Sequence, residues 1–134
     1  MAKESGLGMS CAIDDSGGSA RTISNDITNI DFATPRDTQD ITGLDKSARE
    51  TLLTLADASV TANGIFNDAS NMSHDVLKTV SSTSVERTVT IAISGQTLAM
   101  EMNITDYQLS RSTAGEFTWT APMVLANGAV PTWA

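Results

Sequence analysis

Residues 85–120 constrain the fold most strongly, because apolar and small polar side chains alternate there with a period of two residues. Two alternating runs, 85–94 and 97–104, are separated by the turn sequence Ser94-Gly95-Gln96, and two shorter runs follow. One parity of the first two runs is mainly apolar and consists of Val85, Arg87, Val89, Ile91, Ile93, Leu98, Met100, Met102 and Ile104. Such alternation around a glycine-containing break predicts antiparallel strands that each bury one face. The sequence therefore predicts an antiparallel β-meander.

The opposite parity of the meander is polar and chemically unreactive. It consists of Thr88, Thr90, Ala92, Thr97, Ala99, Glu101 and Asn103. Lysine and proline, which commonly protect the exposed edges of sheets, are absent from this set. We therefore expect the function to depend on a surface that associates with another copy of the chain, rather than on a pocket.

The flanking sequence predicts further strands. Residues 9–14 are expected to form a short strand that ends in a flexible tip at 15–19, and the alternation within 27–32 predicts another. Residues 48–66 are interpreted as one long, kinked strand, although Leu52 to Leu55 fit a helix as well as a strand.

Residues 34–47 show no sustained period and are predicted to form a long irregular loop. Irregular segments of this length within one domain often carry interactions. The candidate inter-subunit residues in this loop are Pro35, Arg36, Asp37, Asp40 and Asp45.

One helix is predicted, over about residues 72–81. Ser73 is a suitable N-cap, and Asp75 lies in the first turn, where the helix dipole favours an acid. Met72, Val76, Leu77 and Val80 recur at helical spacing and are expected to face the core.

Composition limits the class of protein. The 134 residues fit one domain spanning 1–134, and the net charge of −8 argues against a groove that binds nucleic acid through clustered lysine and arginine. The single cysteine, Cys11, permits no internal disulfide, which is typical of folding inside the cell. Met1 to Ser10 lack the apolar segment of a signal peptide, and no apolar run reaches the ~20 residues that span a membrane.

No catalytic, cofactor or metal site is predicted. The only histidine, His74, lies between Ser73 and Asp75, and sequence neighbours do not form a catalytic triad. Cys11 has no motif that pairs it with His74. The spacing of Asp37, Asp40 and Asp45 lacks the glycine and distal glutamate of a calcium loop.

Several blocks along almost the whole chain resemble the major tail (tail tube) proteins of long-tailed, siphovirus-type bacteriophages, in particular those of actinobacterial phages. The blocks are residues 6–8, 14–18, 23–28, 34–47, 62–67, 73–76, 87–91, 105–107 and 127–133. Each block is weak alone, but together they follow the family's order.

The resemblance implies a mainly β protein, an antiparallel β-sandwich with one flanking α-helix, whose sheets join between subunits into a β-barrel. It implies hexameric rings that stack into the tail tube of a virion, with this chain and other phage tail proteins as partners. Such a structural protein is made and assembled in the bacterial cytoplasm, is not an enzyme and has no membrane partner. Genome DNA would pass through the tube without specific binding, because acidic side chains repel phosphate.

The barrel would place one face of the meander in the channel. The lumen-facing candidates are Glu101, Asn103, Thr97, Thr90 and Thr88. Acids near the hairpin tips are an open alternative for the pore mouth: Asp14, Asp15 and Glu116. At the other end of the chain, Val130, Pro131 and Trp133 are predicted to dock on the same sandwich or on a neighbouring subunit. The alternative function is a solitary β-sandwich that serves in adhesion or capsid decoration.

Overall fold

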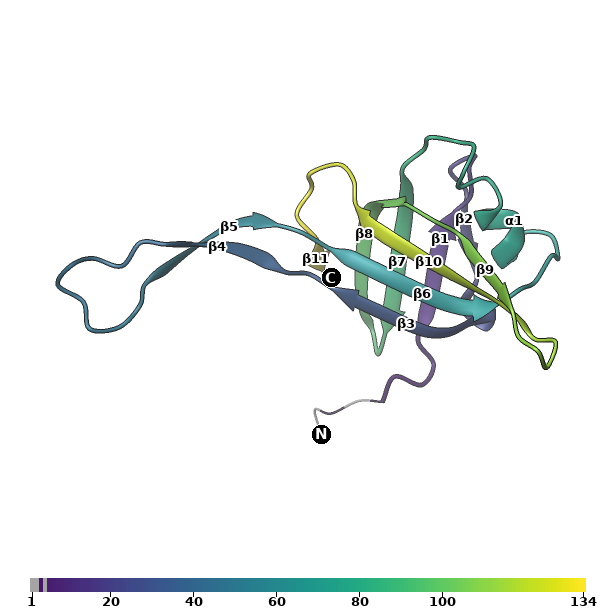
Figure 1. Cartoon of the computed structure of the whole chain (residues 1–134), viewed down its shortest axis with the longest axis horizontal. Coiled ribbons are helices and arrows are strands. Elements are labelled where there is room, and N and C mark those ends of the chain that lie inside the picture. The colour runs from purple at the N-terminus through teal and green to yellow at the C-terminus, as the bar shows by residue number, and fades with distance from the viewer. Residues whose placement is uncertain (1–2, 4) are drawn as a thin grey trace.

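Antiparallel strands make up about half of the computed structural model, which describes residue 3 and residues 5–134 (Figure 1). Met1, Ala2 and Glu4 lie outside the described residues. They belong to the predicted domain span of 1–134 and to the segment in which no signal peptide is expected. The elements in chain order are β1 (Ser10–Asp14), β2 (Ala20–Thr22), a short 3-10 turn (Ser24–Asp26), β3 (Ile27–Ala33), β4 (Arg36–Asp40), β5 (Thr51–Ala56), β6 (Ser59–Ile65), α1 (Ser73–Leu77), β7 (Arg87–Ile93), β8 (Gln96–Ile104), β9 (Gln108–Arg111), β10 (Phe117–Leu125) and β11 (Thr132–Trp133).

Nine strands form one antiparallel sheet in the order β2-β1-β7-β8-β10-β6-β3, with β9 paired to β10 and β11 paired to β8. The predicted meander is confirmed, with one refinement. Strands β8 and β9 follow the same edge of β10, since Ile104 pairs with Met123 and Gln108 pairs with Thr120. They therefore act as one long strand with an interruption between them.

The apolar parities of neighbouring strands coincide across the whole sheet. Ile13 on β1 lies opposite Val89 on β7, which lies opposite Met100 on β8. On the other side of the sheet, Met123 of β10 lies opposite Val60 of β6. The sheet curves, with β3 and β6 in front of β1 and β7 (Figure 1), and these side chains join one buried core. The two expected layers are thus two parts of one continuous sheet.

The segment predicted as an irregular loop contains a strand. β4 pairs with β5 in a separate two-stranded sheet, and only the connection between Asp40 and Thr51 lacks strand structure. This hairpin projects from the body as a long arm (Figure 1). Leu52 to Leu55 are strand rather than helix, and the long strand expected over 48–66 is divided between β5 and β6 at residues 57–58.

The helix is shorter than expected, and its N-cap prediction was wrong. α1 spans only Ser73–Leu77, and its N-cap is Met72. The Ser73 amide donates instead to the Asp26 carboxylate at 3.0 Å, and Asp26 is almost completely buried. A carboxylate distant in sequence therefore serves the helix N-terminus, where the dipole favours negative charge.

The lysine-poor face lies on the central strands and not at a sheet edge. β7 is paired on both sides, with β1 and β8, and β8 is paired with β7 on one side and with β10 and β11 on the other. The edges of the large sheet include β2, which has three residues, and β3, which has seven and pairs only with β6 among the described strands. The expectation that an undefended edge lies in the meander was therefore wrong.

Candidate assembly surfaces

The arm formed by β4 and β5 is held by its own hydrogen bonds. The Arg36 side chain donates twice to the Thr54 carbonyl, and the Asp57 amide donates to the Pro35 carbonyl at the base of the arm. Near the tip, the Thr42 hydroxyl donates to Asp40 at 2.6 Å and accepts the Glu50 amide. The hydrogen bonds that Asp40 accepts from the hydroxyl and the backbone N–H of Thr42 lower the pKa of the Asp40 carboxyl. The arm is thus locally ordered although it projects from the core.

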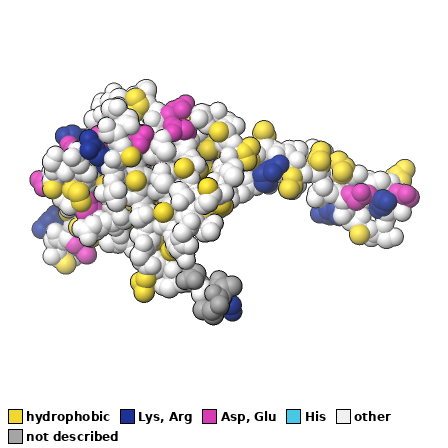
Figure 2. Space-filling model, turned by 180° about the vertical axis from the view of Figure 1, so that it is seen from behind, with side chains coloured by type: hydrophobic (Ala, Val, Ile, Leu, Met, Phe, Trp, Pro, Cys, Tyr) yellow, Lys and Arg dark blue, Asp and Glu magenta, His cyan; other side chains and the backbone are white. Residues whose placement is uncertain are grey.

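The arm exposes apolar side chains that no other part of the described chain covers. Leu52 and Leu53 are each about half exposed, Leu55 is 74% exposed and Leu44 is fully exposed. Figure 2 shows these hydrophobic side chains along the arm, with acidic and basic side chains gathered at its tip. Isolated two-stranded hairpins are marginally stable in water, so a hairpin with leucine on both faces is well suited to contact another protein surface.

The five lumen-facing candidates lie on the outward parity of β7 and β8, opposite the buried methionines. Thr88 pairs with Glu101 across the two strands, and its hydroxyl donates to the Glu101 carboxylate. Glu101 is half-buried on this outward side and does not lie between the layers. By the same parity, Asp14 and Asp31 also face outward. Within the fully described strands β1, β3, β6, β7, β8 and β10, this parity carries no lysine or arginine.

The C-terminal segment returns to the sheet of its own subunit. β11 pairs with β8, and Ala134 exchanges two 2.8 Å backbone hydrogen bonds with Thr97. The ring of Trp133 lies 6.2 Å from that of Phe32, yet its side chain remains 44% exposed. Trp133 therefore contacts its own sheet while nearly half of its side chain stays exposed.

Two sets of candidates that the sequence treated separately lie together. Residues 127–131 belong to the loop that connects β10 to β11, and this loop lies over the outward face of β8. Ala129, Val130 and Pro131 line a cavity of about 170 Å³ together with Thr88 and Glu101. Two of the C-terminal candidates, Val130 and Pro131, thus share a cavity with two of the lumen-facing candidates, Thr88 and Glu101.

A free strand edge lies on the opposite side of the sheet. β3 pairs with β6 on one side, and on its other side a cavity of about 440 Å³ separates it from residues 6–11. Leu7, in this segment, is 89% exposed. Unpaired strand edges readily accept another strand, so β3 is a second candidate for contact between subunits.

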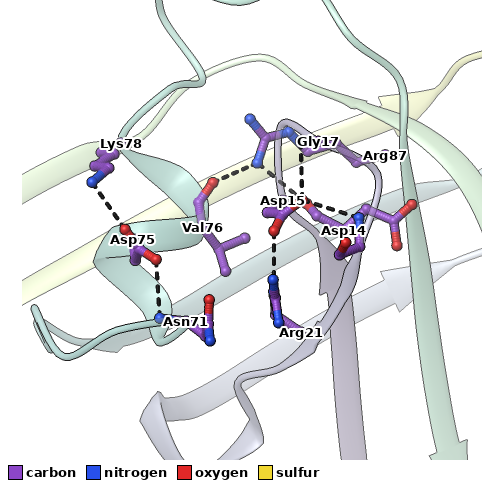
Figure 3. Close-up of polar contacts among 10 residues, drawn as sticks. Asp14, Asp15, Gly17, Arg21, Asn71, Asp75, Val76, Lys78 and Arg87 are labelled. Atoms are coloured by element: carbon purple, nitrogen blue, oxygen red, sulfur yellow. Dashed lines mark hydrogen bonds and ion pairs between the residues drawn. The ribbon is translucent and has the colours of Figure 1, made fainter.

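The hairpin tip of β1 and β2 is fixed by a charged cluster beside α1 (Figure 3). Asp15 accepts the Gly17 and Ser19 amides and forms a 3.0 Å ion pair with Arg21. The Ser19 hydrogen bond contributes most to lowering the pKa of Asp15, followed by the Arg21 contact. Two of the alternative pore-mouth residues, Asp14 and Asp15, therefore lie at this ordered tip, whereas Glu116 lies in the turn between β9 and β10.

Arg87 stabilises the fold, a role that the sequence interpretation did not assign to it. Its guanidinium is buried and donates to the carbonyl oxygens of Val76 and Asp14 and to the Thr79 hydroxyl. Burial lowers the pKa of Arg87, and nearby Asp15 and Asp14 oppose that shift. The signal was present, because an arginine occupied the apolar parity of its strand.

Among the described residues, the surroundings of His74, Tyr107 and Cys11 do not favour nucleophilic catalysis. His74 Nδ1 lies 3.2 Å from the Tyr107 hydroxyl, in a group of aromatic rings that includes Phe66. Burial raises the pKa of Tyr107 to about 12 and that of the Cys11 thiol to about 11. Both groups are therefore protonated near neutral pH, and neither is an activated nucleophile.

The described residues contain neither a metal-binding cluster nor a membrane-spanning helix. No group of three or more histidine, cysteine, aspartate or glutamate side chains there could hold a metal ion. Likewise, no helix within residue 3 and residues 5–134 is long and apolar enough to cross a membrane.

Comparison with known proteins shows the fold. No protein-family model and no curated protein matches the chain. Among solved structures, a chain from the tail of an empty gene transfer agent (GTA) particle, refined with C6 helical symmetry, has a TM-score of 0.81 and 19% identity. That match covers 98% of this chain and 99% of the other.

Two further matches come from different assemblies. A chain from the sheath/tube terminator of an extracellular contractile injection system has a TM-score of 0.74 and 7% identity, covering 100% of this chain and 98% of that one. A chain of the SPP1 tail tube has a TM-score of 0.69 and 9% identity, covering 96% and 81% respectively. The chain therefore has the fold of tail tube proteins.

Proposed function

We propose that this chain is a structural virion protein of a siphovirus-type, actinobacterial-phage-like tail. In this proposal, copies assemble into hexameric rings, and the rings stack into the tail tube. One observation carries the proposal. The fold matches a chain of a C6-symmetric tail over almost its full length, and it also projects an ordered arm with exposed leucines. The protein is structural and not an enzyme. Its partners are other copies and other tail proteins, assembled in the host cytoplasm.

The arm and the free edge of β3 support contacts between different surfaces of identical chains. The leucines of β5 lie on a projection, whereas the β3 edge lies on the body. A contact between two different surfaces is heterologous, and heterologous contacts generate rings or open stacks. We assign the inter-subunit role to this arm, including Pro35, Arg36, Asp37, Asp40 and Asp45.

The outward face of the sheet supports a channel for DNA. Joining the sheets of adjacent subunits into a barrel would remove their free edges. The outward parity would then line the lumen with Glu101, Asn103 and threonines 88, 90 and 97. Asp31 and Glu101, with no lysine or arginine on the outward parity of the described strands, would repel phosphate and let DNA pass without binding. Replacing Glu101 with lysine should leave tubes intact and slow DNA passage.

Electron microscopy of the purified chain tests the proposed function. At high protein concentration, negative-stain images should show rings or tubes. A stable monomer at every concentration would contradict the proposal and favour the alternative, a solitary β-sandwich used in adhesion or capsid decoration.

An arm deletion separates assembly from folding. Joining Arg36 to Ala56 through an Asn-Gly turn removes the rest of both arm strands. A tight turn can connect these two residues, because they already lie opposite each other. This variant should melt like the intact monomer and form no tubes. Replacing Leu53 and Leu55 with serine should weaken assembly, whereas the control Val85→Ser changes an exposed apolar residue outside both the arm and the β3 edge. Unfolding of the arm-deleted chain, or its normal assembly, would overturn the assignment.

A further inference from the structure

The chain contains two Asn-Gly sequences that the fold places in opposite environments. Asn63-Gly64 lies within β6, where Asn63 pairs with Thr120 on one side and with Asn29 on the other. The Asn63 Oδ1 atom accepts the Thr120 hydroxyl at 2.8 Å, and Gly64 is buried. Asn127-Gly128 lies in the loop between β10 and β11, and both of its residues are exposed.

We propose that Asn127 is a site of spontaneous chemical modification in the folded protein. The Gly128 amide nitrogen loses its proton to solvent base and attacks the Asn127 side-chain carbonyl carbon. A C–N bond forms, the bond from that carbon to the side-chain nitrogen breaks, and the nitrogen takes up a proton and leaves as ammonia. The product is a succinimide. Water then opens the ring at either carbonyl and leaves aspartate or isoaspartate at position 127.

The local geometry favours this reaction at Asn127. Its Oδ1 atom accepts the Ala129 amide at 3.1 Å, which folds the side chain back over the intervening Gly128 peptide. The same N–H group would stabilise negative charge that develops on Oδ1 during the attack. Gly128 has no side chain to obstruct the attack, and its φ of 77° marks an open turn outside any strand pairing.

The β6 site resists the same chemistry. Succinimide formation requires the backbone around the asparagine to rotate, and strand pairing on both sides opposes such rotation at Asn63. The surroundings of Gly64 are also tightly packed, because a Cβ added there would lie 2.2 Å from the Asp26 carbonyl oxygen. The fold thus selects between two identical dipeptides.

Modification would change the surface that holds the C-terminal strand. Aspartate at position 127 would add a negative charge to the loop that overhangs Glu101. Isoaspartate would also lengthen the main chain by one atom between β10 and β11. Since β11 is held on β8 only through residues 132–134, a short segment that closely follows this loop, such a change would act directly on its register.

Incubation of the full chain at mildly alkaline pH tests the proposal. Peptide mass mapping and enzymatic methylation of isoaspartate should show conversion at Asn127 and an intact amide at Asn63 in the native protein. In urea, both sites should react. The variant Asn127→Gln should lose the methylation signal seen in the native protein. The longer glutamine side chain would have to close a six-membered ring in place of the five-membered succinimide. Equal conversion of Asn63 and Asn127 in the native state, an unreacted Asn127, or a signal that persists in Asn127→Gln would overturn the proposal.

Discussion

At the residue scale, Gly64 shows how one position controls the core. Trp119 is buried on β10 directly opposite Gly64, and its indole nitrogen donates to the Ile65 carbonyl at 3.0 Å. A Cβ at position 64 would lie 2.6 Å from the Trp119 ring and 2.2 Å from the Asp26 carbonyl oxygen. The largest core side chain therefore requires a residue without a side chain beside it.

We expect Gly64→Ala to destabilise the protein by about 1–3 kcal/mol, the usual cost of overpacking a core. Urea denaturation measures the change. The control Gly6→Ala places a Cβ where nothing lies within 4 Å, so its midpoint should stay unchanged. An unchanged midpoint for Gly64→Ala would show that Trp119 moves aside freely.

Asp15 predicts a pH dependence of stability. Folding lowers its pKa through the Ser19 amide and Arg21, so its contribution is present above the unfolded pKa of about 4 and is lost as pH falls through the folded pKa. Asp15→Asn should therefore melt below the native protein at neutral pH, and the two melting temperatures should converge as pH falls through the folded pKa of Asp15. If the difference in melting temperature persisted unchanged in acid, the charge of Asp15 would not account for it. The effect would then come from its hydrogen bonds with the Gly17 and Ser19 amides alone.

At the element scale, strands were easier to predict than their limits. The alternation in β7, β8 and β10 is local, so it is visible in the sequence. The two ends of α1 depend instead on remote residues. The Arg87 guanidinium donates to the Val76 carbonyl near the C-terminal end, and the Asp26 carboxylate accepts the Ser73 amide at the N-terminal end. These partners are remote in sequence, which is why helical spacing suggested a longer helix.

We expect truncation after Ala129 to lower the melting temperature by a few degrees. The truncation removes the β11 backbone pairing and the half-buried Trp133 ring, a loss of roughly 1–3 kcal/mol. Val130→Ser, which changes an exposed side chain in the same segment, is the matched control. Normal melting with failed assembly would instead show that the segment acts between subunits, and normal melting with normal tubes would leave Trp133 without a role.

At the scale of the whole molecule, charge is expected to govern assembly. Each chain carries a net charge of −8, so approaching subunits repel one another. Added salt screens this repulsion, since the Debye length is about 10 Å at 0.1 M and about 3 Å at 1 M. Light scattering should therefore show faster tube formation from low to moderate salt. Assembly that slows as salt is added would indicate attractive ion pairs, such as contacts through the charged arm tip.

The sequence by itself determined the strand alternation, the inward and outward faces of the meander, and the resemblance to tail tube proteins. These properties depend on side chains close together in the chain, whose period of two is fixed by the geometry of an extended backbone. Only the tertiary structure decided that residues 36–56 pair as an arm, that β7 and β8 are central strands, and that Arg87 is buried. Strand pairing and the solvation of buried groups depend on contacts between distant segments, and a local pattern does not specify which segments meet.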